Sequence, residues 1–216
     1  LFLFVLCFFF FKQKTAYEIR PRDWSSDVCS SDPEVFSNTG GQTSKATPRG
    51  AVAKFSAGGK ASPKKDLALL AMDYQHVYVA RVAYGAKDIQ TLRAFLEAEA
   101  HPGPSIIIAY APCIAHGVDL KYNHRQQNLA VDSGHWPLFR FGPRKAAEGK
   151  NPLQRDSKAP SISFEEFAGK QNRFRMLKKS NPEQAEQLME ASAKDFAARF
   201  DLYQKLADLS ANCGSK

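Results

Sequence analysis

The chain has 216 residues, a formal net charge of +8 and an apolar content of 44%, which is typical of a globular protein. Its longest apolar run, LFLFVLCFFFF at the start, is shorter than the roughly 20 residues that a membrane-spanning helix needs, so we expect no membrane segment. The positive residues are dispersed, with only short pairs such as Lys64-Lys65, so we expect no nucleic-acid partner.

Residues 1–32 differ in kind from the rest of the chain. No charge precedes the apolar run and no small residues follow it, which is unlike a signal peptide. The next string, KQKTAYEIRPRDWSSDVCSSD, resembles the conceptual translation of a sequencing-library adapter, with KQKTAYEI and DWSSDVCSSD as its constant parts. A short secreted leader is the alternative. We expect residues 1–32 to be an artefactual leader that takes no part in the fold.

Without that leader, two cysteines remain, Cys113 and Cys213. Two cysteines so far apart in the sequence do not form a disulfide framework, so nothing points to an oxidising compartment. We therefore expect a cytoplasmic protein. Residues 33–216 are numerous enough for one domain with its own core.

The most informative segment is 34–55, EVFSNTGGQTSKATPRGAVAKF. It opens with a short apolar run, Val35 and Phe36, which breaks at SNTGG; asparagine and paired glycines indicate that a strand ends in a tight turn. A polar loop that contains glycine and follows the carboxyl end of a strand is where α/β proteins bind ligands. An ordinary surface loop is the competing interpretation.

The pattern downstream of this segment alternates between helices and strands. We predict a helix over 66–74, a strand over 76–83, a helix over 88–100 with Asp88 as its N-cap, a buried strand over 104–110, a short helix over 126–133 and a strand over 138–141. Such alternation predicts right-handed βαβ units and a parallel sheet, which is an α/β fold.

The last third of the chain begins with an irregular stretch that continues to about Ser163. Two helices are predicted after it, over about 164–177 and 181–209. We expect Asn181 to cap the longer helix, with Pro182 in its first position. Its apolar residues at helical spacing indicate core or interface packing rather than a cofactor site. They are Leu188, Phe196, Phe200, Tyr203 and Leu206.

Nearly all of the chain after the leader resembles the pyruvate:ferredoxin (flavodoxin) oxidoreductases. Besides 34–55, the strings that carry the resemblance are DLALLAMDY, LRAFLEAEAHPGPSIIIAYAPCIAHG, LAVDSGHWPLFRF and GKNPLQRDSKAPS. It implies a C-terminal fragment. Residues 33–143 would form an incomplete thiamine diphosphate-binding α/β domain, a parallel sheet with helices on both faces. Residues 144–216 would form a crossing segment and C-terminal helices of that domain.

The resemblance assigns roles to the loop after the first strand. It implies that the backbone carbonyl of Val35 is a ligand of Mg²⁺, which prefers oxygen donors. Asn38 would be a catalytic residue beside the reactive thiazolium, where its amide can hydrogen-bond a developing oxyanion. The alternative for Asn38 is a turn residue that tolerates a positive φ. The implied cofactor-binding residues are Glu34, Val35, Phe36, Ser37 and Asn38.

The same resemblance makes Cys113 a ligand of a [4Fe-4S] cluster. Considered alone, Cys113 would be a buried thiol, and a cluster of this kind needs four thiolates. The family's other three cysteines lie upstream, as does its Gly-Asp-Gly motif, and neither occurs in this chain. A family threonine that also binds the metal falls at Pro33, which has no hydroxyl. We therefore expect the chain alone to be inactive.

The family implies an activity and its partners. Thiamine diphosphate attacks the keto carbon of pyruvate, CO₂ leaves, coenzyme A takes the acetyl group, and electrons pass through iron–sulfur clusters to ferredoxin or flavodoxin. A homo-oligomer is expected for the complete enzyme. Two alternatives stay open: a non-catalytic basic α/β binding module, and a related 2-oxoacid oxidoreductase with another substrate.

Overall fold

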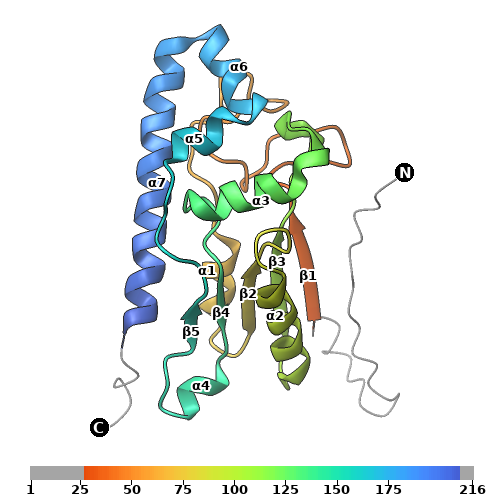
Figure 1. Ribbon diagram of the computed structural model, residues 1–216, viewed down its shortest axis with the longest axis vertical. Helices are drawn as coiled ribbons and strands as arrows, with labels where there is room; N and C mark the ends of the chain where they lie inside the picture. Colours follow the sequence, from red (N-terminus) through yellow and green to blue (C-terminus); the bar gives the residue numbers. More distant parts are fainter. Residues whose placement is uncertain (1–26, 210–216) are drawn as a thin grey trace.

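The computed structural model describes residues 27–209. Its centre is a five-stranded sheet of order β1-β3-β2-β4-β5 (Figure 1). The strands are β1 (Asp27–Asp32), β2 (Tyr78–Val82), β3 (Ser105–Tyr110), β4 (Phe139–Phe141) and β5 (Leu153–Arg155). The helices are α1 (Leu67–Met72), α2 (Asp88–Ala100), α3 (Asn123–Asp132), α4 (Arg144–Ala147), α5 (Phe164–Gly169), α6 (Asn172–Ser180) and α7 (Pro182–Asp208), with two 3-10 turns, η1 (Ile114–His116) and η2 (Leu120–Tyr122).

The α/β class is confirmed, but the sheet is only partly parallel. β1 and β2 run parallel to β3, whereas β4 is antiparallel to β2 and β5 is antiparallel to β4. The cause is the path of the chain after β3. Helix α3 lies across the carboxyl ends of the parallel strands instead of returning along a face, so β4 enters the sheet from that end (Figure 1). The prediction of a wholly parallel sheet is therefore wrong for β4 and β5.

Part of the expected leader belongs to the sheet. Residues 1–26 lie outside the described residues, but Asp27–Asp32 form edge strand β1 in parallel register with β3. The expectation that all of residues 1–32 lie outside the fold is wrong for these six. Strand pairing uses backbone N–H and C=O groups, so the free edge of β3 can accept a strand whatever the origin of its sequence.

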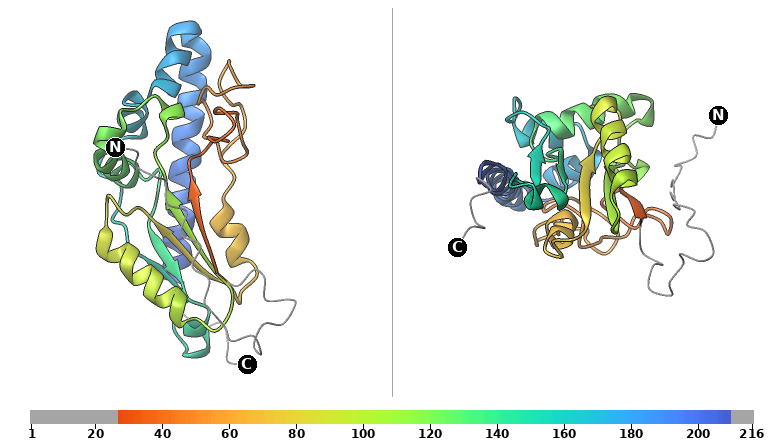
Figure 2. Two further views of the ribbon diagram at one scale, coloured as in Figure 1. Left: turned by 90° about the vertical axis from the view of Figure 1, so that its right-hand side faces the viewer. Right: turned by 90° about the horizontal axis from the view of Figure 1, so that it is seen from below.

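Helices cover both faces of the sheet, as the family resemblance implied (Figure 2). On one face, Ala94 and Ala98 of α2 pack against Tyr78 and Ala80 of β2. On the other, Val79 joins a larger core with α1. Successive residues of β2 thus face opposite layers, and all of its residues are buried. No helix among residues 27–209 is long and apolar enough to cross a membrane.

Helix α7 agrees with its prediction. The Asn181 side chain accepts a hydrogen bond from the Gln184 backbone N–H, and Pro182 occupies the first turn. From the predicted apolar stripe, Phe196, Phe200 and Tyr203 are buried.

Three other predictions of local structure need correction. The helix predicted over 164–177 is divided into α5 and α6, because the chain turns after Gly169 and carries the Gln171 side chain into the core. Lys87, not Asp88, is the N-cap of α2. The stretch predicted to be irregular contains α4 and β5.

Two truncated chains distinguish the contribution of residues 1–26 to stability from that of β1. A chain that starts at Asp27 should keep its unfolding free energy, because we expect residues 1–26 to contribute nothing to stability. A chain that starts at Pro33 should lose about 2–4 kcal/mol of unfolding free energy, because β3 loses its neighbour and each lost hydrogen bond costs roughly 1 kcal/mol. Urea denaturation of the two chains makes the comparison. Equal stability would show that β1 contributes nothing to the fold.

Candidate functional site

Two loops meet at the carboxyl edge of the sheet. Asp32, the last residue of β1, lies opposite Tyr110, the last residue of β3, and both strands run in the same direction. The loop that contains Asn38 and the turn that contains Cys113 therefore leave the sheet side by side, as expected from the sequence. The His116 imidazole Nε2 lies 2.6 Å from the Pro33 carbonyl oxygen and joins the two segments.

The loop after β1 is a tight turn that glycine makes possible. The Phe36 N–H donates to the Gln42 carbonyl at 3.0 Å, and the Gly41 N–H donates to the Phe36 carbonyl at 2.9 Å. Gly40 and Gly41 have φ values of 108° and 83°, which side-chain-bearing residues rarely adopt. Asn38 is exposed and lies within this turn, as the turn-residue interpretation expects, but it does not adopt the positive φ that the interpretation invokes.

Glu34 precedes this turn and is fully buried, with a φ of 59°. Its carboxylate accepts hydrogen bonds from the His135 Nε2 at 2.8 Å and from an Arg173 guanidinium nitrogen at 2.6 Å. The Lys64 ammonium lies 3.3 Å away and also binds the Asp32 carboxylate at 2.7 Å. We call Glu34, Lys64, His135 and Arg173 the buried ionic cluster. It joins the loop after β1 to three distant parts of the chain.

The electrostatics of the buried ionic cluster favour an ionised Glu34. Burial alone would raise its pKa, but attraction to His135, Lys64 and Arg173 holds the pKa well below its usual value. Burial lowers the pKa of His135 to about 4, so this imidazole is neutral near pH 7 and donates its Nε2–H to Glu34. Lys64 and Arg173 therefore provide the positive charge that balances the carboxylate.

Aromatic rings enclose the His135 imidazole. The ring centres of Phe196 and Phe167 lie 4.4 and 4.7 Å from it, and Tyr110 meets it edge to face at 6.1 Å. Its Nδ1 has no hydrogen-bond partner among the described residues, and neither does one guanidinium nitrogen of Arg173. The side of His135 that faces away from Glu34 is thus apolar, which excludes water and strengthens the remaining polar contacts.

Two lysines hold the long loop between the turn and α1. The Lys60 ammonium donates to the carbonyls of Lys45, Thr47 and Pro63 at 2.7–3.0 Å. Lys64 donates to the Ala46 carbonyl at 2.8 Å. Burial and the neighbouring charges of Lys64 and Arg49 lower the pKa of Lys60 to about 8. Both ammonium groups are used to fix the backbone of this loop.

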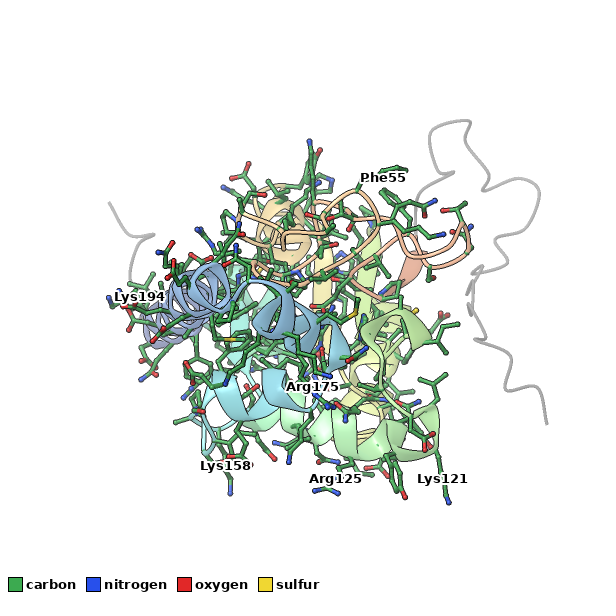
Figure 3. All side chains as sticks on the ribbon, turned by 90° about the horizontal axis from the view of Figure 1, so that it is seen from above. Phe55, Lys121, Arg125, Lys158, Arg175 and Lys194 are labelled. Atoms are coloured by element: carbon green, nitrogen blue, oxygen red, sulfur yellow. The ribbon has the colours of Figure 1, made fainter. Side chains whose placement is uncertain are left out.

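The basic side chains around this edge of the sheet are dispersed over the surface. Figure 3 looks down on the edge and shows Phe55 projecting from the rim of the long loop, where it is 89% exposed. The labelled basic residues do not gather into one patch in this view. They are Lys121, Arg125, Lys158, Arg175 and Lys194. This distribution agrees with the dispersed charge in the sequence.

Cys113 begins the turn after β3. It is half-buried, and its Sγ accepts a hydrogen bond from the Ala115 N–H at 3.4 Å. In the opposite direction, the Cys113 N–H donates a hydrogen bond to His116 Nδ1 at 3.5 Å. Burial lowers the pKa of His116 to about 3, so this imidazole is also neutral. Cys113 is therefore held at the edge of the site by a small reciprocal cap.

The described residues supply only part of the cofactor sites that the resemblance implies. The Val35 carbonyl accepts no hydrogen bond from them, so it fits the role of a metal ligand. Pro33 offers no hydroxyl, and the carboxylates of Asp32 and Glu34 are paired with cations. No group of three or more His, Cys, Asp or Glu among residues 27–209 could hold a metal ion. The donors among residues 27–209 therefore do not form a complete Mg²⁺ site or a complete iron–sulfur site.

The comparisons with known proteins give one consistent result, although no family model matches. Over 176 residues the chain is 57% identical to the pyruvate-flavodoxin oxidoreductase of Nostoc sp., a match covering 82% of this chain. Over 177 residues it is 54% identical to the pyruvate:ferredoxin oxidoreductase of Moorella thermoacetica, also 82% of this chain. The chain belongs to the pyruvate-flavodoxin/ferredoxin oxidoreductase family. It spans about 15% of the length of these two relatives.

A more distant relative has a different electron acceptor, NADP(+), in its name. The chain is 46% identical over 179 residues to the mitochondrial pyruvate dehydrogenase [NADP(+)] of Euglena gracilis. That match covers 82% of this chain and 10% of the relative.

The sequence points to the loop after β1 and to Cys113, which the structure places at one edge of the sheet, but not to the residues that fix them there. No motif in the sequence distinguishes His135 or Arg173 as functional, or the Glu34 side chain from the rest of its loop. The sequence held one indirect signal: His135 lies in a string that carries the family resemblance, LAVDSGHWPLFRF. No spacing in the sequence relates Glu34 to Arg173, which are 139 positions apart.

Replacing Glu34 should measure how strongly the buried ionic cluster stabilises the fold. Glu34→Gln keeps the size of the side chain but leaves the buried Arg173 without its carboxylate partner and Lys64 with Asp32 alone, so unfolding free energy should fall by about 3–5 kcal/mol. The control is Glu190→Gln, which breaks an exposed ion pair with Lys194 and should cost no more than about 0.5 kcal/mol. Similar losses in both variants, measured in urea, would contradict the assignment.

His135 should make stability depend on pH in a defined direction. Its pKa is about 4 in the folded chain and roughly 6.5 when unfolded. Between these values the unfolded chain binds more protons, so unfolding free energy should fall as pH drops from 7 to 5, by up to about 1.4 kcal/mol per pH unit. This is the contribution of His135 alone, and buried His116, whose pKa is also lowered, adds a similar one. His135→Gln should therefore remove about half of the total slope, whereas exposed His124→Gln should leave it unchanged. Parallel curves for wild type and His135→Gln would be the contrary result.

Proposed function

We propose that this chain forms part of the thiamine diphosphate site of an enzyme that oxidatively decarboxylates pyruvate to acetyl-CoA and CO₂. The observation that supports the proposal is the junction of the two loops at one sheet edge: the segment Glu34–Asn38 and the Cys113 turn meet through His116 and Pro33. Its sequence is more than half identical to enzymes whose names give this substrate. Electrons would leave through iron–sulfur clusters to flavodoxin or ferredoxin.

The segment Glu34–Asn38 is proposed to bind the cofactor, and three residues at this edge have individual proposed roles in the complete site. Val35 contributes its backbone carbonyl to Mg²⁺, and the exposed Asn38 amide can hydrogen-bond an oxygen of the substrate that gains negative charge. Cys113 contributes one thiolate to a [4Fe-4S] cluster. When bound, thiamine diphosphate supplies the carbanion chemistry that amino-acid side chains cannot. The carboxylate of Glu34 is paired within the buried ionic cluster and fixes the backbone that leads into Val35.

The relatives differ in the electron acceptor that their names give. Those from Nostoc and Moorella carry flavodoxin and ferredoxin in their names, whereas the one from Euglena carries NADP(+). All three names contain pyruvate, which favours pyruvate over another 2-oxoacid. We propose flavodoxin or ferredoxin because the chain is more similar to the first two. We further propose a cytoplasmic homo-oligomer for the complete enzyme.

The chain by itself should show no pyruvate-dependent activity. Pro33 offers no hydroxyl, and one thiolate cannot hold a four-iron cluster. After reconstitution with iron and sulfide, the chain should lack the broad visible absorbance of iron–sulfur proteins and should not reduce a low-potential dye with pyruvate. Turnover by the chain alone would contradict this expectation.

A restored chain tests the roles directly. Adding the family's upstream segments and a threonine at position 33 should recover turnover. In that enzyme, Cys113→Ala should reduce electron transfer far more than stability, whereas Cys213→Ala should change neither. Equal activity in both variants would remove Cys113 from the proposed electron path.

A further inference from the structure

His116 bridges two segments that are distant in sequence. Its Nε2 lies 2.6 Å from the Pro33 carbonyl, 83 positions earlier, and its Nδ1 accepts from the Cys113 N–H at 3.5 Å. The side chain is fully buried. One ring thus contacts both the strand end that leads into the Glu34–Asn38 loop and the first residue of the Cys113 turn.

The geometry fixes which ring nitrogen carries the hydrogen. A carbonyl oxygen can only accept, so Nε2 must donate to Pro33; a backbone N–H can only donate, so Nδ1 must accept from Cys113. The imidazole is therefore neutral, and its lowered pKa agrees. Both nitrogens are used at the same time, one for each segment.

A second contact joins the same two segments. A Cβ placed on Gly41 would lie 3.2 Å from the Ala115 Cβ, so the loop backbone packs closely against η1. On its other side the turn is fixed against α6. Gly117 has a φ of 67°, and a Cβ there would lie 2.2 Å from the Asn172 Cβ. The Cys113 turn is thus packed closely against α6 on one side and against the Glu34–Asn38 loop on the other, while Ile114 is exposed to solvent.

We propose that His116 is a positioning residue that couples the Cys113 turn to the Glu34–Asn38 loop, so that a group attached to the Cys113 thiol changes the conformation or stability of the loop. The coupling is a consequence of the contacts above. Its meaning for catalysis rests on the proposed function: a cluster on Cys113 and a cofactor on the loop would then be held in a fixed relation through one imidazole.

Two substitutions of His116 each keep one of the two hydrogen bonds of the ring and remove the other. In His116→Gln, the amide nitrogen reaches about as far as Nε2 and can still donate to Pro33. In His116→Asn, the shorter side chain can accept from Cys113 in place of Nδ1 but cannot reach Pro33. The Asn variant should therefore lose the coupling while it keeps the local cap. The Gln variant should retain the coupling, because it keeps the contact to Pro33 and the backbone hydrogen bond from the residue 116 N–H to the Cys113 carbonyl.

The experiment needs neither cofactor nor activity. Cys7, Cys29 and Cys213 are replaced by serine in the full chain, which leaves Cys113 as the single thiol, and the protein is compared before and after alkylation with iodoacetamide. The readout is hydrogen exchange at the Gly40 and Gly41 amides, which donate to the Ser37 and Phe36 carbonyls. Exchange in α2 is the internal control and should not change.

With His116 present, alkylation should change exchange at the two glycines by roughly tenfold, the effect expected from loss of about one buried hydrogen bond. His116→Gln should respond similarly, and His116→Asn by less than about a third as much. An equal response in wild type and His116→Asn, or no response in wild type, would overturn the proposal. If His116→Asn does not fold, His116→Met, which fills a similar space but cannot donate to Pro33, takes its place and should also respond by less than about a third as much as wild type. None of these results depends on turnover, so failure of the coupling and failure of the proposed function are distinguishable.

Discussion

The carboxylate of Glu34 is the group on which the arrangement of this edge depends. It is fully buried, its backbone has a positive φ, and its partners come from the loop before α1, from the segment before β4 and from α6. A positive φ in a residue with a side chain costs of order 1 kcal/mol or more. A buried carboxylate without partners would cost far more. The conformation persists because the partners satisfy the charge only when the backbone takes this path.

The position of Glu34 also sets the position of the next residues in the loop. Val35 has its side chain in the core and its carbonyl without a partner among the described residues, while the turn from Phe36 to Gly40 stays exposed. The long loop that returns to α1 is held by Lys60 and Lys64, whose ammonium groups bind backbone carbonyls. Ala51 anchors this loop in the main apolar core, and the two lysines fix its backbone elsewhere. The result is a rigid base beneath an accessible turn, which is what a ligand-binding loop requires.

The sheet places this base beside the Cys113 turn. Parallel pairing of β1 with β3 brings the two strand ends together, and His116 connects the backbone beyond them. β1 is made from a segment whose sequence suggests no part in the domain, which shows how little strand pairing at an edge depends on side chains. What matters at this position is that a strand ends opposite Tyr110, so that the next residues enter the buried ionic cluster.

The sequence by itself determined the α/β class, the existence of β2, α2, β3 and α7, the turn at Gly40-Gly41 and the family. These depend on local periodicity, on the conformational freedom of glycine and on long characteristic strings, all of which can be read along the chain. It did not reveal the antiparallel entry of β4, the division between α5 and α6, the pairing of residues 27–32 or the partners of Glu34. Tertiary structure decided these, because they depend on contacts between positions that are far apart in the sequence. The charge of a buried glutamate can be balanced only by side chains that the complete fold brings to it, and no local pattern records which lysine, histidine or arginine will arrive there.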